Sequence, residues 1–288
     1  MTSRAVAGVA MALCGLTAAA CGTAGAGATP AFNPPPATPQ QQAAPSEASR
    51  SNGSKGEPSS DPAPGSTASD PLHGKVVVID PGHNGGNAAH PEIINREVDV
   101  LTKRKPCDTT GTSTNNGYSE AAFTWDVSKR MAAILRAKGA TVKLTRKNNT
   151  SVGPCITERA AIGNKAKADA AISVHADGAA PANHGFHVIM PKKINGPVDP
   201  VVADSRKLGI AVRDAFRAGT GLPYSNYIGD KALDFRDDLG GLNLSTVPKV
   251  FVESGNMRNP TEAAKFHSPA FRQKIAQALA DGVQNYLN

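Results

Sequence analysis

From residue 75 onward, short runs of β-branched and small apolar residues alternate with longer segments in which apolar residues recur at helical spacing. Lys75–Ile79 has the sequence Lys-Val-Val-Val-Ile, which is typical of a strand buried on both faces. The apolar stripe of Ser119–Ala137 predicts a helix with Ser119 as its N-cap and Gly139 as its stop. Further strands are predicted at Thr141–Thr145, Ala170–Val174, Gly185–Met190 and Lys249–Glu253, and further helices at Ile156–Lys167, Val201–Ala218, Thr261–Phe266 and Pro269–Tyr286.

This alternation of strands and helices indicates βαβ units. The predicted fold class is therefore α/β: a single domain over residues 72–288, with a mainly parallel twisted sheet and helices on both faces. Ligands of such sheets bind beyond the carboxyl ends of the strands. The stretch Asp234–Asn243, rich in Asp and Gly, is predicted to be a loop that either contacts a substrate or is simply solvated.

The first 71 residues have a different composition from the rest. Residues 1–28 contain one charge, Arg4, followed by the apolar run Ala5–Ala20 and small-residue sites, which together predict a secretory signal peptide. A membrane anchor is the alternative, but the run is shorter than the roughly 20 apolar residues of a span. Residues 29–71 are rich in Pro, Ser, Ala, Gly and Gln, which predicts a disordered linker. Lipidation at Cys21 is a further alternative, although the leucine typical of lipoprotein signals is missing.

Export changes the expectation for the two cysteines beyond the linker, Cys107 and Cys155. Cysteines in an oxidising compartment usually pair, so we predict a Cys107–Cys155 disulfide. Two free buried thiols are the alternative. Zinc binding by this pair is not expected, since no other Cys or His lies at the spacing of a structural zinc site.

The charge of the chain is concentrated in its folded part. The net charge is +7, of which residues 1–28 contribute +1 and residues 29–71 contribute −2, so residues 72–288 carry +8. A basic exported domain is attracted to anionic surfaces such as a cell wall, although a merely solvated basic surface is equally consistent. We expect no nucleic-acid partner, because the Lys and Arg residues are scattered and no nucleic-acid motif is present. No transmembrane span is expected after signal cleavage.

Four polar residues lie at predicted ends of strands and helices. His83 follows the first strand within Asp80-Pro-Gly-His83, His175 and Glu253 end two later strands, and Glu120 opens the first helix. Two histidines and a glutamate are a known catalytic zinc set that leaves one position for water. Zinc lowers the pKa of that water to about 7, and a second carboxylate then serves as general base. Glu253 fits this second role.

Each of these residues also has a purely structural interpretation. His83 could shape a turn, Glu120 could complement a helix dipole, His175 could be a hydrogen-bonded core residue, and Glu253 could pair with Arg258. The metal site is favoured because all four are expected at one edge of the sheet.

The roles of three further polar residues are open. Asp80 either orients a metal ligand or only caps the turn. His184 and His187 are predicted to be surface residues rather than ligands.

Several motifs resemble, in order, those of the zinc-dependent N-acetylmuramoyl-L-alanine amidases, the amidase-3 family, and the likeness is greatest to stand-alone mycobacterial cell-wall amidases. The motifs lie at Val78–His83, Gly117–Glu120, Thr145-Arg146, Glu158-Arg159, Asn164, Ser173–Asp177 and Pro248–Asn256. The family commonly has Gly where this chain has Asn84, and Phe where it has Asn256. The segment 84–119, with its basic Lys103–Lys105, is longer than is usual in the family.

The resemblance implies that His83, Glu120 and His175 hold one Zn²⁺ ion and that Glu253 is the catalytic carboxylate. It implies a peptidoglycan hydrolase. The predicted signal peptide places this enzyme in the periplasm or cell wall, and we expect a monomer. This enzyme would cleave the amide bond between N-acetylmuramic acid and L-alanine in peptidoglycan or muropeptide fragments.

Two other functions share these sequence features. An exported zinc carboxypeptidase acting on stem peptides would use the same metal set, and a non-catalytic cell-wall-binding protein would share the export signal and charge. A serine hydrolase is not expected, because Gly-x-Ser-x-Gly is absent.

Overall fold

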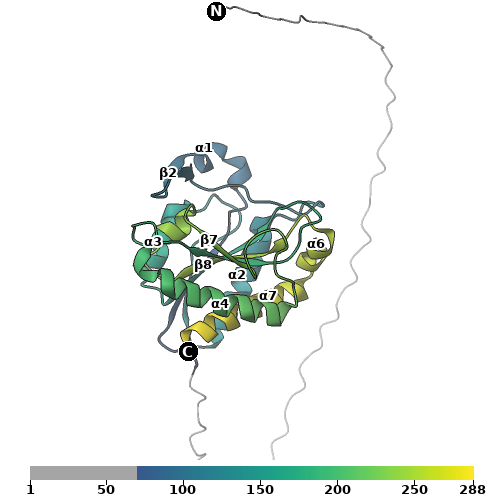
Figure 1. The fold of residues 1–288 in the computed structure, drawn as a ribbon. Coiled ribbons are helices and arrows are strands. Elements are labelled where there is room, and N and C mark those ends of the chain that lie inside the picture. The colour runs from purple at the N-terminus through teal and green to yellow at the C-terminus, as the bar shows by residue number, and fades with distance from the viewer. Residues whose placement is uncertain (1–69) are drawn as a thin grey trace, which may run out of the picture. The chain divides into compact units, whose positions relative to one another are not determined.

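A computed structural model of the protein describes residues 70–288 (Figure 1). The signal peptide predicted for residues 1–28, the alternative lipidation site Cys21 and all but the last two residues of the predicted linker 29–71 lie outside the described residues. Within residues 70–288, the helices are too short or too polar to cross a membrane.

A six-stranded sheet with the order β4-β1-β5-β8-β6-β7 forms the centre of the domain. Strands β4, β1, β5 and β8 are mutually parallel, β6 is antiparallel to β8, and β7 is parallel to β6. The strands of this sheet are β1 Val76–Pro81, β4 Thr141–Leu144, β5 Ala170–Asp177, β6 His187–Pro191, β7 Leu233–Arg236 and β8 Lys249–Asn256. The predicted α/β fold with a mainly parallel sheet is confirmed.

Helices cover both faces of the sheet, as Figure 1 shows for α3, α4 and α7. The longer helices are α2 Glu120–Ala137, α3 Ile156–Lys165, α4 Val202–Thr220, α6 Pro260–His267 and α7 Pro269–Leu287. The short ones are η1 Asn87–Ala89, α1 Pro91–Ile94, η2 Asp199–Val201 and α5 Gly240–Asn243. Each predicted helix is present, with ends shifted by one or two residues.

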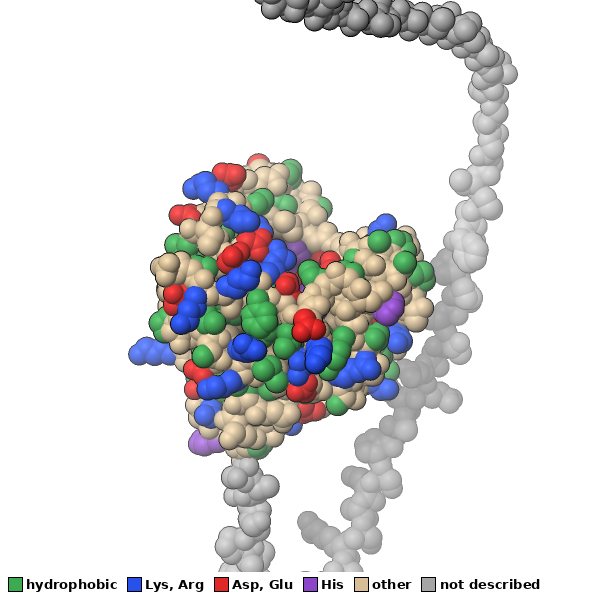
Figure 2. Space-filling model, viewed as in Figure 1, with side chains coloured by type: hydrophobic (Ala, Val, Ile, Leu, Met, Phe, Trp, Pro, Cys, Tyr) green, Lys and Arg blue, Asp and Glu red, His purple; other side chains and the backbone are tan. Residues whose placement is uncertain are grey.

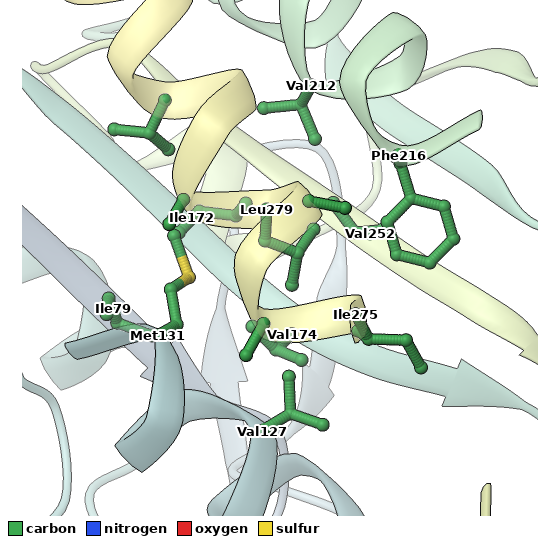
Figure 3. Packing of buried hydrophobic residues seen from close by; sticks show 14 of the residues in the cluster. Ile79, Val127, Met131, Ile172, Val174, Val212, Phe216, Val252, Ile275 and Leu279 are labelled. Atoms are coloured by element: carbon green, nitrogen blue, oxygen red, sulfur yellow. The ribbon is translucent and has the colours of Figure 1, made fainter. Parts of the chain in front are cut away.

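One face of the sheet is apolar. Because side chains alternate along a strand, every second residue points to the same side. On this side Ile79, Ile172, Val174 and Val252 pack against residues of α2, α4 and α7, including Leu279 (Figure 3). These side chains form the main hydrophobic core, and removing them from water stabilises the fold.

The opposite face carries polar residues at the intervening positions. Asp80 pairs in register with Ser173, and His175 pairs with Glu253, so these side chains share one side of the sheet. A small apolar cluster around Val78 covers the start of this face beneath α3. The carboxyl ends of β1, β5 and β8 are therefore left with polar side chains next to one another.

Two segments differ from the sequence prediction. The stretch Asp234–Asn243 is not a continuous loop, because it contains most of β7 and all of α5. In β7, Leu233 and Phe235 pack on the core while the alternate residues are polar, a pattern of only four residues that is easily missed. Segment 84–119 contains η1, α1 and a two-stranded hairpin of β2 Glu97–Asp99 and β3 Arg104–Pro106, none of which was predicted.

Candidate metal centre and active site

Three chain segments bring His83, Glu120 and His175 together. His83 lies two residues beyond β1, Glu120 is the first residue of α2, and His175 lies near the end of β5. One ligand atom from each residue lies within 4.8 Å of the others, so the three could hold a metal ion. We call these residues the metal-binding group.

Glu120 occupies the centre of the metal-binding group. Its Oε2 lies 3.2 Å from His83 Nε2, and its Oε1 lies 3.0 Å from His175 Nδ1. The carboxylate also accepts hydrogen bonds from the backbone N–H groups of Thr112 and Ala176. Burial opposes ionisation, but the charge of His83 and the hydrogen bonds from both histidines outweigh it and lower the pKa of Glu120. The side chain is therefore ionised, as a metal ligand would need to be.

The local structure of α2 fixes Glu120 in this position. Ser119 has an extended backbone and its hydroxyl accepts a hydrogen bond from the Ala122 N–H, as an N-cap does. The carboxylate of Glu120 consequently projects from the first turn, beyond the apolar stripe that packs on the sheet. The predicted N-cap is confirmed, and so is the helix stop, since Gly139 has a φ of +91°.

His83 has a strained backbone, with a φ of +55°. Its Nε2 faces Glu120, while its Nδ1 faces away and lies 3.1 Å from the carbonyl oxygen of Thr109 and 3.4 Å from Asp108 Oδ1. Burial alone would lower the pKa of His83, but the carboxylates of Glu120 and Asp108 raise it to about 10. With this pKa the imidazole is protonated at neutral pH. A metal ion would therefore have to displace the proton on Nε2 in order to bind that atom.

Two glycines make room for the metal-binding group. A methyl group on Gly82 would come within 2.3 Å of the His175 ring, and one on Gly111 within 2.7 Å of both Glu120 and His83. These distances are too short for real contacts. The backbone therefore forms a close cradle around the two imidazole rings and the carboxylate.

Glu253 lies beside the metal-binding group on the neighbouring strand β8, as the register partner of His175. Its Oε2 is buried and has no hydrogen-bond partner among the described residues. Burial, reinforced by the charges of Glu120 and Asp177, raises the pKa of Glu253 well above its ordinary value. An unpartnered carboxyl group with a raised pKa is suited to hold and transfer a proton.

The metal-binding group and Glu253 line a single open cleft of about 430 Å³, together with Asp177, Arg236 and other residues. A smaller and more apolar pocket of about 190 Å³ adjoins it and shares His83 and His175 with it. In Figure 2 the surface is hollowed beside the segment that carries α1 and β2, and a histidine side chain is visible in the hollow. The four predicted residues thus meet at one surface that a substrate can reach.

The hydrogen bonds and ion pairs of Asp80 go to residues outside the metal-binding group, and their number shows that it does more than cap a turn. Its buried carboxylate accepts hydrogen bonds or ion pairs from four side chains, Thr145, Arg159, Ser173 and Lys249. Despite burial, the charges of Lys249 and Arg159 and these hydrogen bonds lower the pKa of Asp80. Arg159 also donates to the carbonyl groups of Pro81 and His83, so this network supports the turn that carries His83.

The predicted disulfide between Cys107 and Cys155 is confirmed. It joins the segment after β3 to the N-terminus of α3. Asp108 and Thr109, which contact His83, directly follow the first of these cysteines. Sequence analysis missed both residues, and their position next to a cysteine of the unusually long segment 84–119 was the only available signal.

The prediction for His187 was wrong, because its side chain is only 2% exposed. It lies on β6 as the register partner of Glu253, and burial lowers its pKa. His184 is partly exposed, in the loop before β6. Among the described residues, the possible metal ligands include neither of these histidines.

Asn84 and Asn256, the two positions at which this chain differs from the common family residues, both form hydrogen bonds. The amide of Asn84 donates a hydrogen bond to Asp108, and the amide of Asn256 donates to the carbonyl groups of Ala180 and Asn183. Asn84 therefore belongs to the polar surroundings of His83, whereas Asn256 organises the loop after β5.

Comparison with known proteins decides the family. The family model Amidase_3, described as N-acetylmuramoyl-L-alanine amidase, matches residues 77–285. This chain belongs to the amidase-3 family. This amidase is 42% identical over 218 residues to N-acetylmuramoyl-L-alanine amidase Rv3717 of Mycobacterium tuberculosis, a match that covers 75% of this chain and 88% of the relative.

Solved structures agree with this assignment. The amidase Ami1 from Mycobacterium smegmatis matches with a TM-score of 0.71 and 40% identity, over 75% of this chain and 98% of that chain. Ami1 from Mycobacterium abscessus matches with a TM-score of 0.70 and 40% identity, over 75% and 100% respectively. The predicted family, fold class and enzyme class are confirmed.

Proposed function

We propose that this amidase hydrolyses the bond between N-acetylmuramic acid and L-alanine, with one zinc ion held by His83, Glu120 and His175 and with Glu253 as the catalytic carboxylate. The family and the 42% identity to a named amidase support the activity. The convergence of the three possible ligands with an unpartnered glutamate in one cleft carries the assignment of residues.

The donor set fits zinc. Two imidazole nitrogens and one carboxylate oxygen are typical ligands of a catalytic zinc site with an open position. When bound, zinc activates water and polarises the substrate carbonyl. The buried Glu120 anion would offset much of the ion's charge, and Gly82 and Gly111 leave space at the rings.

The remaining chemistry belongs to Glu253. Its Oε2 has no hydrogen-bond partner within residues 70–288, so it is available to accept the proton of the attacking water and to return it to the leaving L-alanine nitrogen. Its burial and the charges of Glu120 and Asp177 raise its pKa. A base with a raised pKa accepts the proton more readily, and the resulting acid still donates to an amine.

Substitution of Glu253 by Gln tests this role. The variant should retain zinc but lose about 10²–10⁴-fold in turnover, because the proton carrier is removed while the shape is kept. Mass spectrometry of a defined muropeptide, with and without a chelator, should show chelator-sensitive release of an intact stem peptide with a free L-alanine amine. Glu97→Gln, on the exposed hairpin, is the matched control.

Other products would point to other functions. Loss of only a terminal amino acid would indicate the carboxypeptidase, and absence of product despite bound zinc and retained wall binding would indicate a binding protein. Full activity of Glu253→Gln would contradict the assignment of the carboxylate.

We also propose that the enzyme works as a monomer outside the cytoplasm, in the periplasm or cell wall, on peptidoglycan or its muropeptide fragments. A disulfide persists in an oxidising compartment, which supports export. The charge of +8 on residues 72–288 favours contact with an anionic wall.

A further inference from the structure

The segment Cys107–Thr109 touches His83 on the side that faces away from Glu120. The Thr109 carbonyl oxygen lies 3.1 Å from His83 Nδ1, and Asp108 Oδ1 lies 3.4 Å from the same atom. His83 Nε2 lies on the opposite side of the ring, 3.2 Å from Glu120 Oε2. The two nitrogens of one imidazole thus face two different sets of oxygen atoms.

This segment is anchored on both sides. The backbone N–H of Cys107 donates to Arg96, and the carbonyl of Cys107 accepts from Ile156. The Cys107–Cys155 disulfide adds a covalent link to the N-terminus of α3. Asp108 and Thr109 are therefore fixed relative to both the hairpin and α3, rather than free to follow the imidazole.

The Asp108 carboxylate is also fixed through its second oxygen, Oδ2. It is 7% exposed, and its Oδ2 accepts from Arg159 at 3.1 Å and from the Asn84 amide at 3.2 Å. The same guanidinium nitrogen of Arg159 donates to the backbone carbonyl of His83 at 3.1 Å. One arginine thus ties the carboxylate to the backbone of the residue whose ring it faces.

His83 needs such support because its left-handed backbone is unfavourable for a residue with a side chain. Three oxygen atoms face Nδ1 of its ring: the Thr109 carbonyl at 3.1 Å, the Thr109 hydroxyl at 3.2 Å and Asp108 Oδ1 at 3.4 Å.

We propose that Asp108, together with the Thr109 carbonyl, is a positioning residue that holds the Nδ1–H of His83 and so directs the Nε2 lone pair toward the metal. Histidine ligands of metals usually donate their second N–H to a carboxylate or carbonyl, which fixes the tautomer and the ring orientation. This inference rests on the proposed function, since it requires His83 to be a ligand. Asp108 itself would touch neither metal nor substrate.

Zinc affinity of purified, disulfide-intact protein tests the inference independently of activity. Competition with a chromophoric chelator should show that Asp108→Ala weakens zinc binding by about 10–100-fold. Asp108→Asn keeps the volume and one acceptor oxygen, so it should weaken binding less and remain folded. The cobalt-substituted Asp108 variants, at full occupancy, should show shifted d–d absorption bands, which a loss of stability alone does not produce.

A control separates this effect from the loss of any arginine–carboxylate ion pair. Asp126 is bound by Arg130 and Arg272 at 2.9 and 2.6 Å, away from the metal-binding group. Asp126→Asn should leave zinc affinity and the cobalt spectrum as in the wild type.

Two results would overturn the inference, and one would overturn its premise. Wild-type zinc affinity in Asp108→Ala, or an unchanged affinity and cobalt spectrum in Asp108→Asn if the alanine variant does not fold, would exclude the positioning role. In either case His83→Ala, measured alongside, should still lose zinc. If His83→Ala also binds zinc like the wild type, the proposed metal site itself is wrong.

Discussion

The two faces of the central sheet come from the same strands, residue by residue in alternation. On β8, Val252 points into the core under α2, α4 and α7, whereas the next residue, Glu253, points into the cleft. On the apolar face, buried side chains are stabilised by contact with other apolar side chains alone. On the polar face, buried side chains need hydrogen bonds or opposite charges to offset the loss of water. Among the described residues, Glu253 Oε2 is one of six buried side-chain atoms without such a partner, and it is the carboxylate among them that lines the cleft.

This comparison predicts that changes at the metal-binding group and Glu253 remove activity and leave the fold, whereas changes on the apolar face lower stability and leave zinc binding unchanged. His175→Ala should show the largest effect. It removes one of three proposed ligands, so zinc content should fall and turnover should drop by about 1,000-fold, because a bound metal supplies several kcal/mol. Metal analysis and the muropeptide assay measure both, with His90→Ala as the exposed control. Retention of full zinc and activity would break the distinction between the faces.

On the apolar face, Leu279→Ala should lower the free energy of unfolding by about 2–5 kcal/mol, through lost burial and the cavity left behind. Denaturant titration measures this, and zinc affinity of the folded fraction should not change. Leu101→Ala is the matched control, since Leu101 is 49% exposed and should change stability by less than about 0.5 kcal/mol. Equal effects of the two substitutions would show that Leu279 is not packed in the core.

The disulfide lies on the polar side but should act mainly on stability. The double variant Cys107→Ser/Cys155→Ser should lose about 2–4 kcal/mol of unfolding free energy, because the unfolded chain is no longer cross-linked. Urea titrations of the variant and of the reduced wild type should give the same loss. If the reduced wild type is as stable as the oxidised protein, the link contributes nothing to the fold.

Acid should destabilise the polar face through Asp80. Its pKa is lowered in the folded protein, so its contribution is present above the ordinary pKa of 3.8 and is lost as pH falls below it. Melting temperatures measured from pH 7 to pH 2.5 should therefore fall more steeply for the wild type than for Asp80→Asn, although the variant is less stable at neutral pH. Parallel curves would exclude this carboxylate as a source of acid sensitivity.

The sequence predicted the apolar face almost completely. Runs such as Lys75–Ile79 and the stripe of α2 show their period locally, so neighbouring residues are sufficient to recognise them. The sequence also predicted that four polar residues lie near one another, because the carboxyl ends of parallel strands meet at one edge of a sheet. These residues are His83, Glu120, His175 and Glu253.

The surroundings of the site were less predictable, because they depend on contacts between distant segments. Apart from the neighbouring Cys107, nothing near Asp108 indicates that it meets His83, 25 positions earlier, since the hairpin and the disulfide determine that approach. The prediction that His187 lies at the surface was wrong for a similar reason. A polar residue at the start of a strand does not indicate which other elements of the fold cover it. The four residues of β7 are too few for their alternation to be distinguished from a loop.

The ends of the sheet in the hydrogen-bonding direction have a consequence for solubility. Both outer strands, β4 and β7, are four residues long. On β4, Lys143 is exposed and the Arg136 guanidinium donates to the Val142 carbonyl at 3.0 Å, while β7 carries Asp234 and Arg236. Long, open and uncharged strand edges recruit strands from other molecules. These short, charged edges offer little backbone for such pairing, so the folded domain should resist edge-to-edge aggregation even where many copies are crowded together.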